Sequence, residues 1–119
     1  MRLAVFASGS GTNFEAIAQA CIKGDIPASV EILICDKPHA YVIERAKKLN
    51  IRSFVFNPKD YKKRSEYEGE IIKILNELEI DLICLAGYMR IVGDSLLEAY
   101  KDRIINIHPA LLPSFKGAH

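Results

Sequence analysis

Short apolar runs alternate along this chain with longer segments of helical periodicity, and that alternation is what most limits the folds open to it. The runs at 3–7, 30–35, 53–56 and 82–86 are four to six residues long and are bounded by glycine, proline or polar turn residues. Runs of that length are too short for helices and are typical of strands buried on both faces. A fifth short apolar run leads into Asn106 and His108.

Between these strands, apolar residues recur at the three- and four-residue spacing of amphipathic helices. The first such stripe has Thr12 and Glu15 placed as a capping box and ends at Gly24; its expected inner face is Phe14, Ile17, Ala18, Cys21 and Ile22. Further helices are expected at 42–49, 65–79 and 94–100. Strands alternating with helices predict a doubly wound, mostly parallel α/β sheet of the Rossmann type, with about five strands and helices on both faces.

Length and charge narrow the class of protein. The chain has 119 residues, which predicts a single domain over 1–119, and its net charge is +1. The near-neutral charge does not favour nucleic-acid binding, and neither a membrane-spanning run nor a signal peptide is evident. The three cysteines, Cys21, Cys35 and Cys84, are widely separated, which predicts reduced thiols in the cytoplasm and no metal site.

Three polar or glycine-bearing segments follow predicted strands. They are 8–13, 87–92 and 106–109. Open parallel sheets bind ligands outside the carboxyl ends of their strands, so we expect these segments to converge on one crevice.

The segment 8–13 reads Ser-Gly-Ser-Gly-Thr-Asn and joins a strand to a helix. Glycines at such a place let backbone N–H groups face an anion, and the helix dipole favours a phosphate. A plain strand-to-helix turn is the alternative. A dinucleotide is another, with Asp36 as the ribose-binding acid, although Phe14 stands where the third glycine of the dinucleotide pattern belongs. A nucleoside triphosphate loop is excluded, because no Gly-Lys-Ser or Gly-Lys-Thr follows.

Asn106 and His108 alternate with apolar neighbours, so both are expected on one face of the last strand. The amide offers a fixed donor and acceptor, and the imidazole exchanges a proton near neutral pH. A reactive pair is one interpretation. The other is a polar strand end, with the Asn capping a turn.

Three segments together closely resemble the glycinamide ribonucleotide transformylases: 8–13, 85–91 (Leu-Ala-Gly-Tyr-Met-Arg-Ile) and 106–113 (Asn-Ile-His-Pro-Ala-Leu-Leu-Pro). The order and spacing agree along the whole chain. The last segment alone is shared with other folate-linked formyltransferases and hydrolases. The first two favour the purine-synthesis family.

The resemblance implies formyl transfer from 10-formyltetrahydrofolate to the amine of glycinamide ribonucleotide, with no metal. It assigns the ribonucleotide phosphate to Gly11, Thr12 and Asn13. It assigns the folate to a larger set: Arg64, Met89, Arg90, Ile91, Val92 and Asn106. Asn106 would also hydrogen-bond the formyl oxygen, and His108 would carry the catalytic proton.

Members of the family are considerably longer, and their remaining part carries an aspartate that completes the catalytic group. We therefore interpret this chain as an amino-terminal portion and expect slow turnover from it alone. An open sheet edge would allow a homodimer. Two alternatives stay open: a formyltetrahydrofolate hydrolase or other folate-linked formyltransferase, and a non-catalytic nucleotide-binding module.

Overall fold

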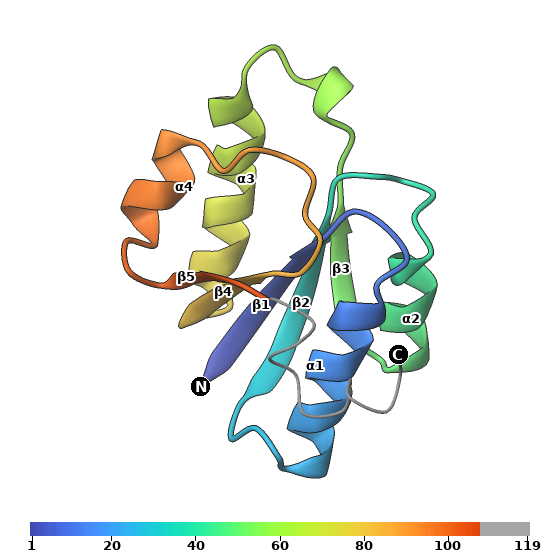
Figure 1. Ribbon diagram of the computed structural model, residues 1–119. Helices are drawn as coiled ribbons and strands as arrows, with labels where there is room; N and C mark the ends of the chain where they lie inside the picture. Colours follow the sequence, from blue (N-terminus) through green and yellow to red (C-terminus); the bar gives the residue numbers. More distant parts are fainter. Residues whose placement is uncertain (108–119) are drawn as a thin grey trace.

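A computed structural model describes residues 1–107 and contains one five-stranded sheet in which every pair of neighbours is parallel. The strands lie in the order β3-β2-β1-β4-β5 (Figure 1). Their bounds are β1 Arg2–Ala7, β2 Ser29–Cys35, β3 Arg52–Val55, β4 Leu82–Leu85 and β5 Ile104–Asn106. The predicted doubly wound α/β fold is confirmed, and the predicted strand positions hold to within a residue or two.

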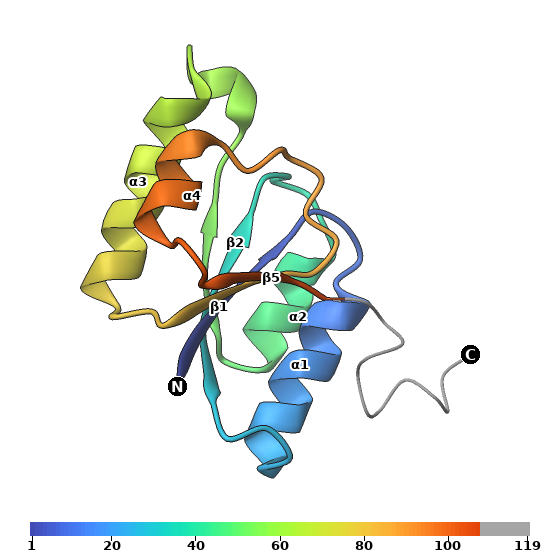
Figure 2. The ribbon, with the colours of Figure 1, turned by 60° about the vertical axis from the view of Figure 1, so that its left-hand side comes forward.

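Helices cover both faces of this sheet (Figures 1 and 2). They are α1 Thr12–Lys23, α2 Val42–Lys48, α3 Arg64–Glu77 and α4 Asp94–Ala99, with a 3-10 turn η1 at Pro58–Asp60. The apolar faces of α1 and α2 pack with one side of β1 and β2, whereas α3 and α4 pack on the other side. Successive strand residues alternate between these two hydrophobic clusters, as buried parallel strands require.

The order of the strands places a switch point between β1 and β4. From β1 the chain proceeds outward to β2 and β3, then returns to the other side of β1 and proceeds to β4 and β5. The loops that leave β1 and β4 therefore diverge at the carboxyl edge of the sheet. This is where open α/β sheets form their ligand crevice.

The predicted capping box at the start of α1 is wrong. The residue that caps the helix is Gly11, in a left-handed conformation with φ of 83°, and no side chain caps the helix there. Glu15 instead forms an ion pair with Arg45 of α2, with 2.7 Å between Nη1 and Oε1. The Glu15 carboxylate, which the local pattern assigned to the helix cap, is therefore engaged in a tertiary ion pair with Arg45.

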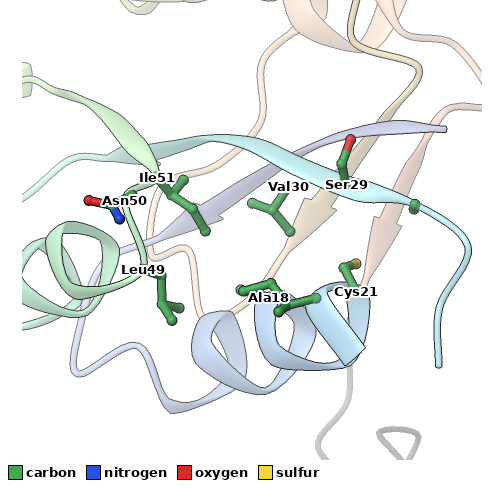
Figure 3. A pocket seen from close by; sticks show the side chains of 9 residues that line it. Ala18, Cys21, Ser29, Val30, Leu49, Asn50 and Ile51 are labelled. Atoms are coloured by element: carbon green, nitrogen blue, oxygen red, sulfur yellow. The ribbon is translucent and has the colours of Figure 1, made fainter. Parts of the chain in front are cut away.

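Ile22, which the helical spacing assigns to the inner face of α1, is 64% exposed. It is among the residues that line a hollow of about 250 Å³ between the last turns of α1 and the starts of β2 and β3. Figure 3 shows Cys21 and Val30 on two sides of this hollow. The other predicted inner positions of α1 are buried or half-buried. The hollow lies at the amino-terminal edge of the sheet, opposite the predicted crevice.

Glu68 lies on the buried face of α3, a role that the apolar pattern did not predict. Its side chain is 2% exposed and accepts hydrogen bonds from the backbone N–H groups of Gly93 at 2.7 Å and Leu96 at 3.3 Å. Gly93 is the N-cap of α4, so the carboxylate satisfies N–H groups that the short helix leaves unpaired. Helix α4 thus takes its cap from another helix.

We expect Glu68→Ala to lower the free energy of unfolding by about 2 kcal/mol, because two buried N–H groups lose their acceptor. Urea denaturation followed by circular dichroism would measure the change. Glu70→Ala is the matched control on the same helix, since Glu70 accepts an exposed hydrogen bond from the Tyr61 hydroxyl, and its loss should cost less than about 0.5 kcal/mol. Equal losses in the two variants would contradict the assigned role of Glu68.

Candidate functional site

The turn between β1 and α1 presents backbone N–H groups at the carboxyl edge of the sheet. The chain leaves the buried Ser8, turns through Gly11 and enters the helix at Thr12. Within residues 1–107, the N–H groups of Ser10, Gly11, Thr12 and Asn13 donate to no other protein group. A pocket of about 210 Å³ opens over them, and it is lined by Gly9, Ser10, Gly11, Thr12, Asn13, Ala86 and Gly87. Two of the three predicted segments therefore meet at the switch point.

Gly11 allows this turn to approach α2. A Cβ at this position would lie 2.4 Å from Cγ2 of Val42, and the φ of 83° is one that other residues rarely adopt. No other residue type fits here without moving α2. The glycine seen in the sequence thus has a packing reason as well as a conformational one.

A buried carboxylate joins the ends of three strands next to this pocket. Asp36, directly after β2, accepts hydrogen bonds from the hydroxyl of Ser8 and from Nε of Arg90, the latter at 3.2 Å. The Ser8 hydroxyl in turn accepts a hydrogen bond from the N–H of Met89 at 2.8 Å. Because both Asp36 oxygens are engaged and the side chain is fully buried, Asp36 is not placed to bind a ribose. The dinucleotide interpretation therefore lacks the acidic residue that would bind the ribose.

The segment after β4 exposes apolar side chains and free backbone groups. Met89 and Ile91 are 75% and 71% exposed. Of the part of the chain that the structure describes, no group accepts a hydrogen bond from the N–H of Arg90, Ile91 or Val92. This combination can accept a flat ligand that has both apolar faces and polar edges.

Contacts with Phe6 and Arg64 fix the two ends of that segment. Tyr88 packs edge-to-face on Phe6 with 5.2 Å between ring centroids, and burial raises the pKa of its phenol. At the other end, Arg64 lies against Gly93: the Arg64 Cδ is 2.6 Å from the position that a Cβ added to Gly93 would take. Arg64 is the first residue of α3 and is exposed. The structure thus brings Arg64 to the end of the segment that contains four other predicted folate residues, 89–92, whereas Asn106 lies on β5.

Asn106 is the last residue of β5 and its side chain is exposed. It pairs with Leu85 of β4, which pairs with Phe6 of β1, so the three residues form a row across the sheet. Neighbouring strands lie about 4.8 Å apart, which places Asn106 roughly 10 Å from β1. Ala86 and Gly87, which line the pocket, follow Leu85 directly. His108 lies outside the described residues.

The cysteines take no part in this arrangement. All three carry free thiols, and burial raises the pKa of Cys35 and brings that of Cys84 to about 11. Both groups therefore stay protonated near neutral pH and are poor nucleophiles. Over residues 1–107 no group of three or more His, Cys, Asp or Glu side chains could hold a metal ion, and no helix there is long and apolar enough to cross a membrane.

Sequence reasoning missed one residue beside the site, Arg45. It lies on α2, donates from Nε to the carbonyl oxygen of Ser10 at 2.7 Å and pairs with Glu15. A charged position on an amphipathic helix is ordinary, so no pattern in the sequence marks it. Only the packing of α2 against the turn reveals the contact.

Comparison with known proteins identifies relatives of this chain. The chain is 53% identical over 116 residues to the phosphoribosylglycinamide formyltransferase of Bacillus subtilis, covering 98% of this chain and 60% of that protein. It is 37% identical over 118 residues to the human trifunctional purine biosynthetic protein adenosine-3, covering 99% of this chain and 12% of that protein. The chain thus spans about three fifths of the Bacillus relative.

Solved structures give the same result. The glycinamide ribonucleotide transformylase 1 of Geobacillus kaustophilus superposes with a TM-score of 0.88 at 58% identity, over 96% of this chain and 61% of that one. The phosphoribosylglycinamide formyltransferase of Bacillus halodurans gives 0.86 at 52% identity, over 97% and 59%. The family model described as formyl transferase matches residues 1–119. The chain belongs to the formyl transferase family.

Proposed function

We propose that this protein transfers a formyl group from 10-formyltetrahydrofolate to the amine of glycinamide ribonucleotide, a step of purine synthesis. The observation that carries the proposal is the pocket of free N–H groups at the switch point, with the exposed Asn106 on a nearby strand. The names of the relatives, which are phosphoribosylglycinamide formyltransferases, support the same substrate.

The ribonucleotide phosphate binds at the turn before α1. Among the described residues 1–107, the N–H groups of Gly11, Thr12 and Asn13 have no acceptor, and they lie at a helix start, where a negative charge is favoured. The pocket of about 210 Å³ above them suits a phosphate and part of a ribose. The amine of the substrate then extends from this anchor toward β5.

The folate binds along the segment after β4. The pterin lies against Met89 and Ile91 and pairs with the free backbone groups of residues 90–92, and Asn106 contributes a further hydrogen bond. Arg64 and Arg90 supply positive charge for the carboxylates of the folate tail, although Nε of Arg90 is already held by Asp36.

The reaction requires two groups. The substrate amine attacks the formyl carbon, and the negative charge that builds on the formyl oxygen is stabilised by the Asn106 amide, worth about 3 kcal/mol. The new carbon–nitrogen bond forms first, and the tetrahedral adduct then collapses as the bond to the folate nitrogen breaks. The amine loses one proton and the folate nitrogen gains one, and His108 carries that proton.

The phosphate requirement tests the proposal. Glycinamide ribonucleotide should bind at least about 100-fold more tightly than the riboside that lacks the phosphate, since several charge-assisted hydrogen bonds are lost. Isothermal titration calorimetry of both ligands would measure the ratio. Equal affinities would contradict a phosphate site at Gly11, and formyltetrahydrofolate consumption without ribonucleotide would favour the hydrolase alternative.

Two further properties extend the proposal. We place the protein in the cytoplasm, supported by its three free thiols. We also propose that a homodimer forms, since β5 is an edge strand among the residues that the structure describes. Light scattering coupled to gel filtration would measure the mass.

A further inference from the structure

Helix α2 binds two successive carbonyl groups of the turn between β1 and α1. The N–H of Val42 donates to the carbonyl of Gly9 at 3.1 Å, and Nε of Arg45 donates to the carbonyl of Ser10 at 2.7 Å. In a trans peptide the C=O and N–H bonds point in opposite directions. Because both carbonyls face α2, the N–H groups of Ser10 and Gly11 face away from it. Two successive N–H groups on one side make a concave anion site.

Arg45 also balances a charge beside that site. Glu15 lies in the first turn of α1, where its carboxylate would repel an anion bound at the helix start. Nη1 of Arg45 pairs with it at 2.7 Å. The Arg45 guanidinium therefore holds the Ser10 carbonyl away from the anion site and neutralises the Glu15 carboxylate beside it.

Contacts with three residues hold the Arg45 side chain in this position. It is 23% exposed, and its guanidinium lies 5.0 Å from the ring centroid of Tyr41, within the range of a cation–π contact. With Ser10, Glu15 and Tyr41 as partners, the guanidinium has little freedom to turn toward solvent. Its geometry is that of a fixed fork, which a lysine reproduces only in part.

We propose that Arg45 is a positioning residue for the ribonucleotide phosphate: by holding the Ser10 carbonyl it orients the Gly11 N–H toward the anion, beside the Ser10 N–H that the contact of Val42 with Gly9 orients. The inference rests on the proposed function, because it concerns the same phosphate site. Arg45 does not contact the phosphate in this mechanism. It acts through the Ser10 carbonyl, with the neutralisation of Glu15 as a secondary effect.

Calorimetric titration of the purified chain with glycinamide ribonucleotide and with inorganic phosphate tests this role. Arg45→Gln should weaken binding of both ligands about tenfold, and Arg45→Lys should recover part of that loss. Affinity for a folate analogue should be unchanged, which separates positioning from general destabilisation. Arg52→Gln, which removes a positive charge at the start of β3, is the control and should bind both ligands like the wild type.

A double variant distinguishes the two effects of Arg45. Arg45→Gln combined with Glu15→Gln should still bind at least about fivefold more weakly than the wild type, because the Ser10 carbonyl remains unheld. Full recovery in the double variant would overturn the proposal, since only charge neutralisation would then matter. Unchanged affinity in Arg45→Gln would overturn it as well.

Nuclear magnetic resonance separates this inference from the proposed function. Without ligand, Arg45→Gln should shift the amide signals of Ser10 and Gly11, whereas Arg52→Gln should not. If the wild type bound neither probe, the proposed function would fail, and these two signals would still report on the turn. Unshifted Ser10 and Gly11 signals would overturn the role of Arg45 even if the wild type bound the ribonucleotide tightly.

Discussion

Replacing Gly11 by alanine is expected to lower the free energy of unfolding by about 3 kcal/mol and to abolish ribonucleotide binding. A left-handed residue other than glycine costs about 1–2 kcal/mol, and forcing an extra carbon into a packed site costs about 1–3 kcal/mol. Here the added Cβ would lie 2.4 Å from Cγ2 and 2.9 Å from Cα of Val42. The turn must move away from α2, and its N–H groups then lose their common direction.

Substitutions at Gly24 and Gly9 separate the cost of the left-handed backbone from the cost of packing the added Cβ. Gly24 has nearly the same φ, 88°, but a Cβ there would meet nothing within 4 Å, so Gly24→Ala should cost only about 1 kcal/mol. A Cβ on Gly9 also meets nothing within 4 Å, and Gly9→Ala should cost less than about 0.5 kcal/mol. Chemical denaturation of the three variants measures the series. Equal losses for Gly11→Ala and Gly24→Ala would show that contact with Val42 has no cost.

The second large effect is expected on the reaction rate. His108→Ala should lower formyl transfer by about 10²–10⁴-fold, because the departing folate nitrogen loses its proton donor. Ribonucleotide binding should be preserved, since the phosphate site is built from the turn at Gly11. Initial rates of tetrahydrofolate release with saturating substrates would measure the change, alongside calorimetric binding of the ribonucleotide.

Two variants complete that experiment. His39→Ala is the control, because His39 is an exposed residue in the connection between β2 and α2 and should leave the rate unchanged. Asn106→Ala should lower the rate about 10²–10³-fold through loss of the donor to the formyl oxygen. A His108→Ala variant with the wild-type rate would contradict the proton-carrying role. Absence of turnover in the unsubstituted chain, with ribonucleotide binding retained, would favour the nucleotide-binding module.

Local sequence determined the elements of this protein. Buried strands and amphipathic helices differ in the spacing of their apolar residues, and that spacing is set by the geometry of each element. The positions of the strands, the helices and the glycine turn after β1 therefore follow from the order of residues alone. Since parallel strands need crossover helices, the alternation also predicted the doubly wound sheet and the edge at which 8–13 and 87–92 meet.

Tertiary structure alone decided which polar groups pair inside that framework. The contacts of Asp36 with Ser8, Glu68 with Gly93 and Arg45 with Ser10 join residues 28, 25 and 35 positions apart. No periodicity reports such a pair, because each residue has ordinary spacing within its own element. Each buried polar group takes whichever partner the packed elements bring within hydrogen-bond distance, and only the folded chain determines that.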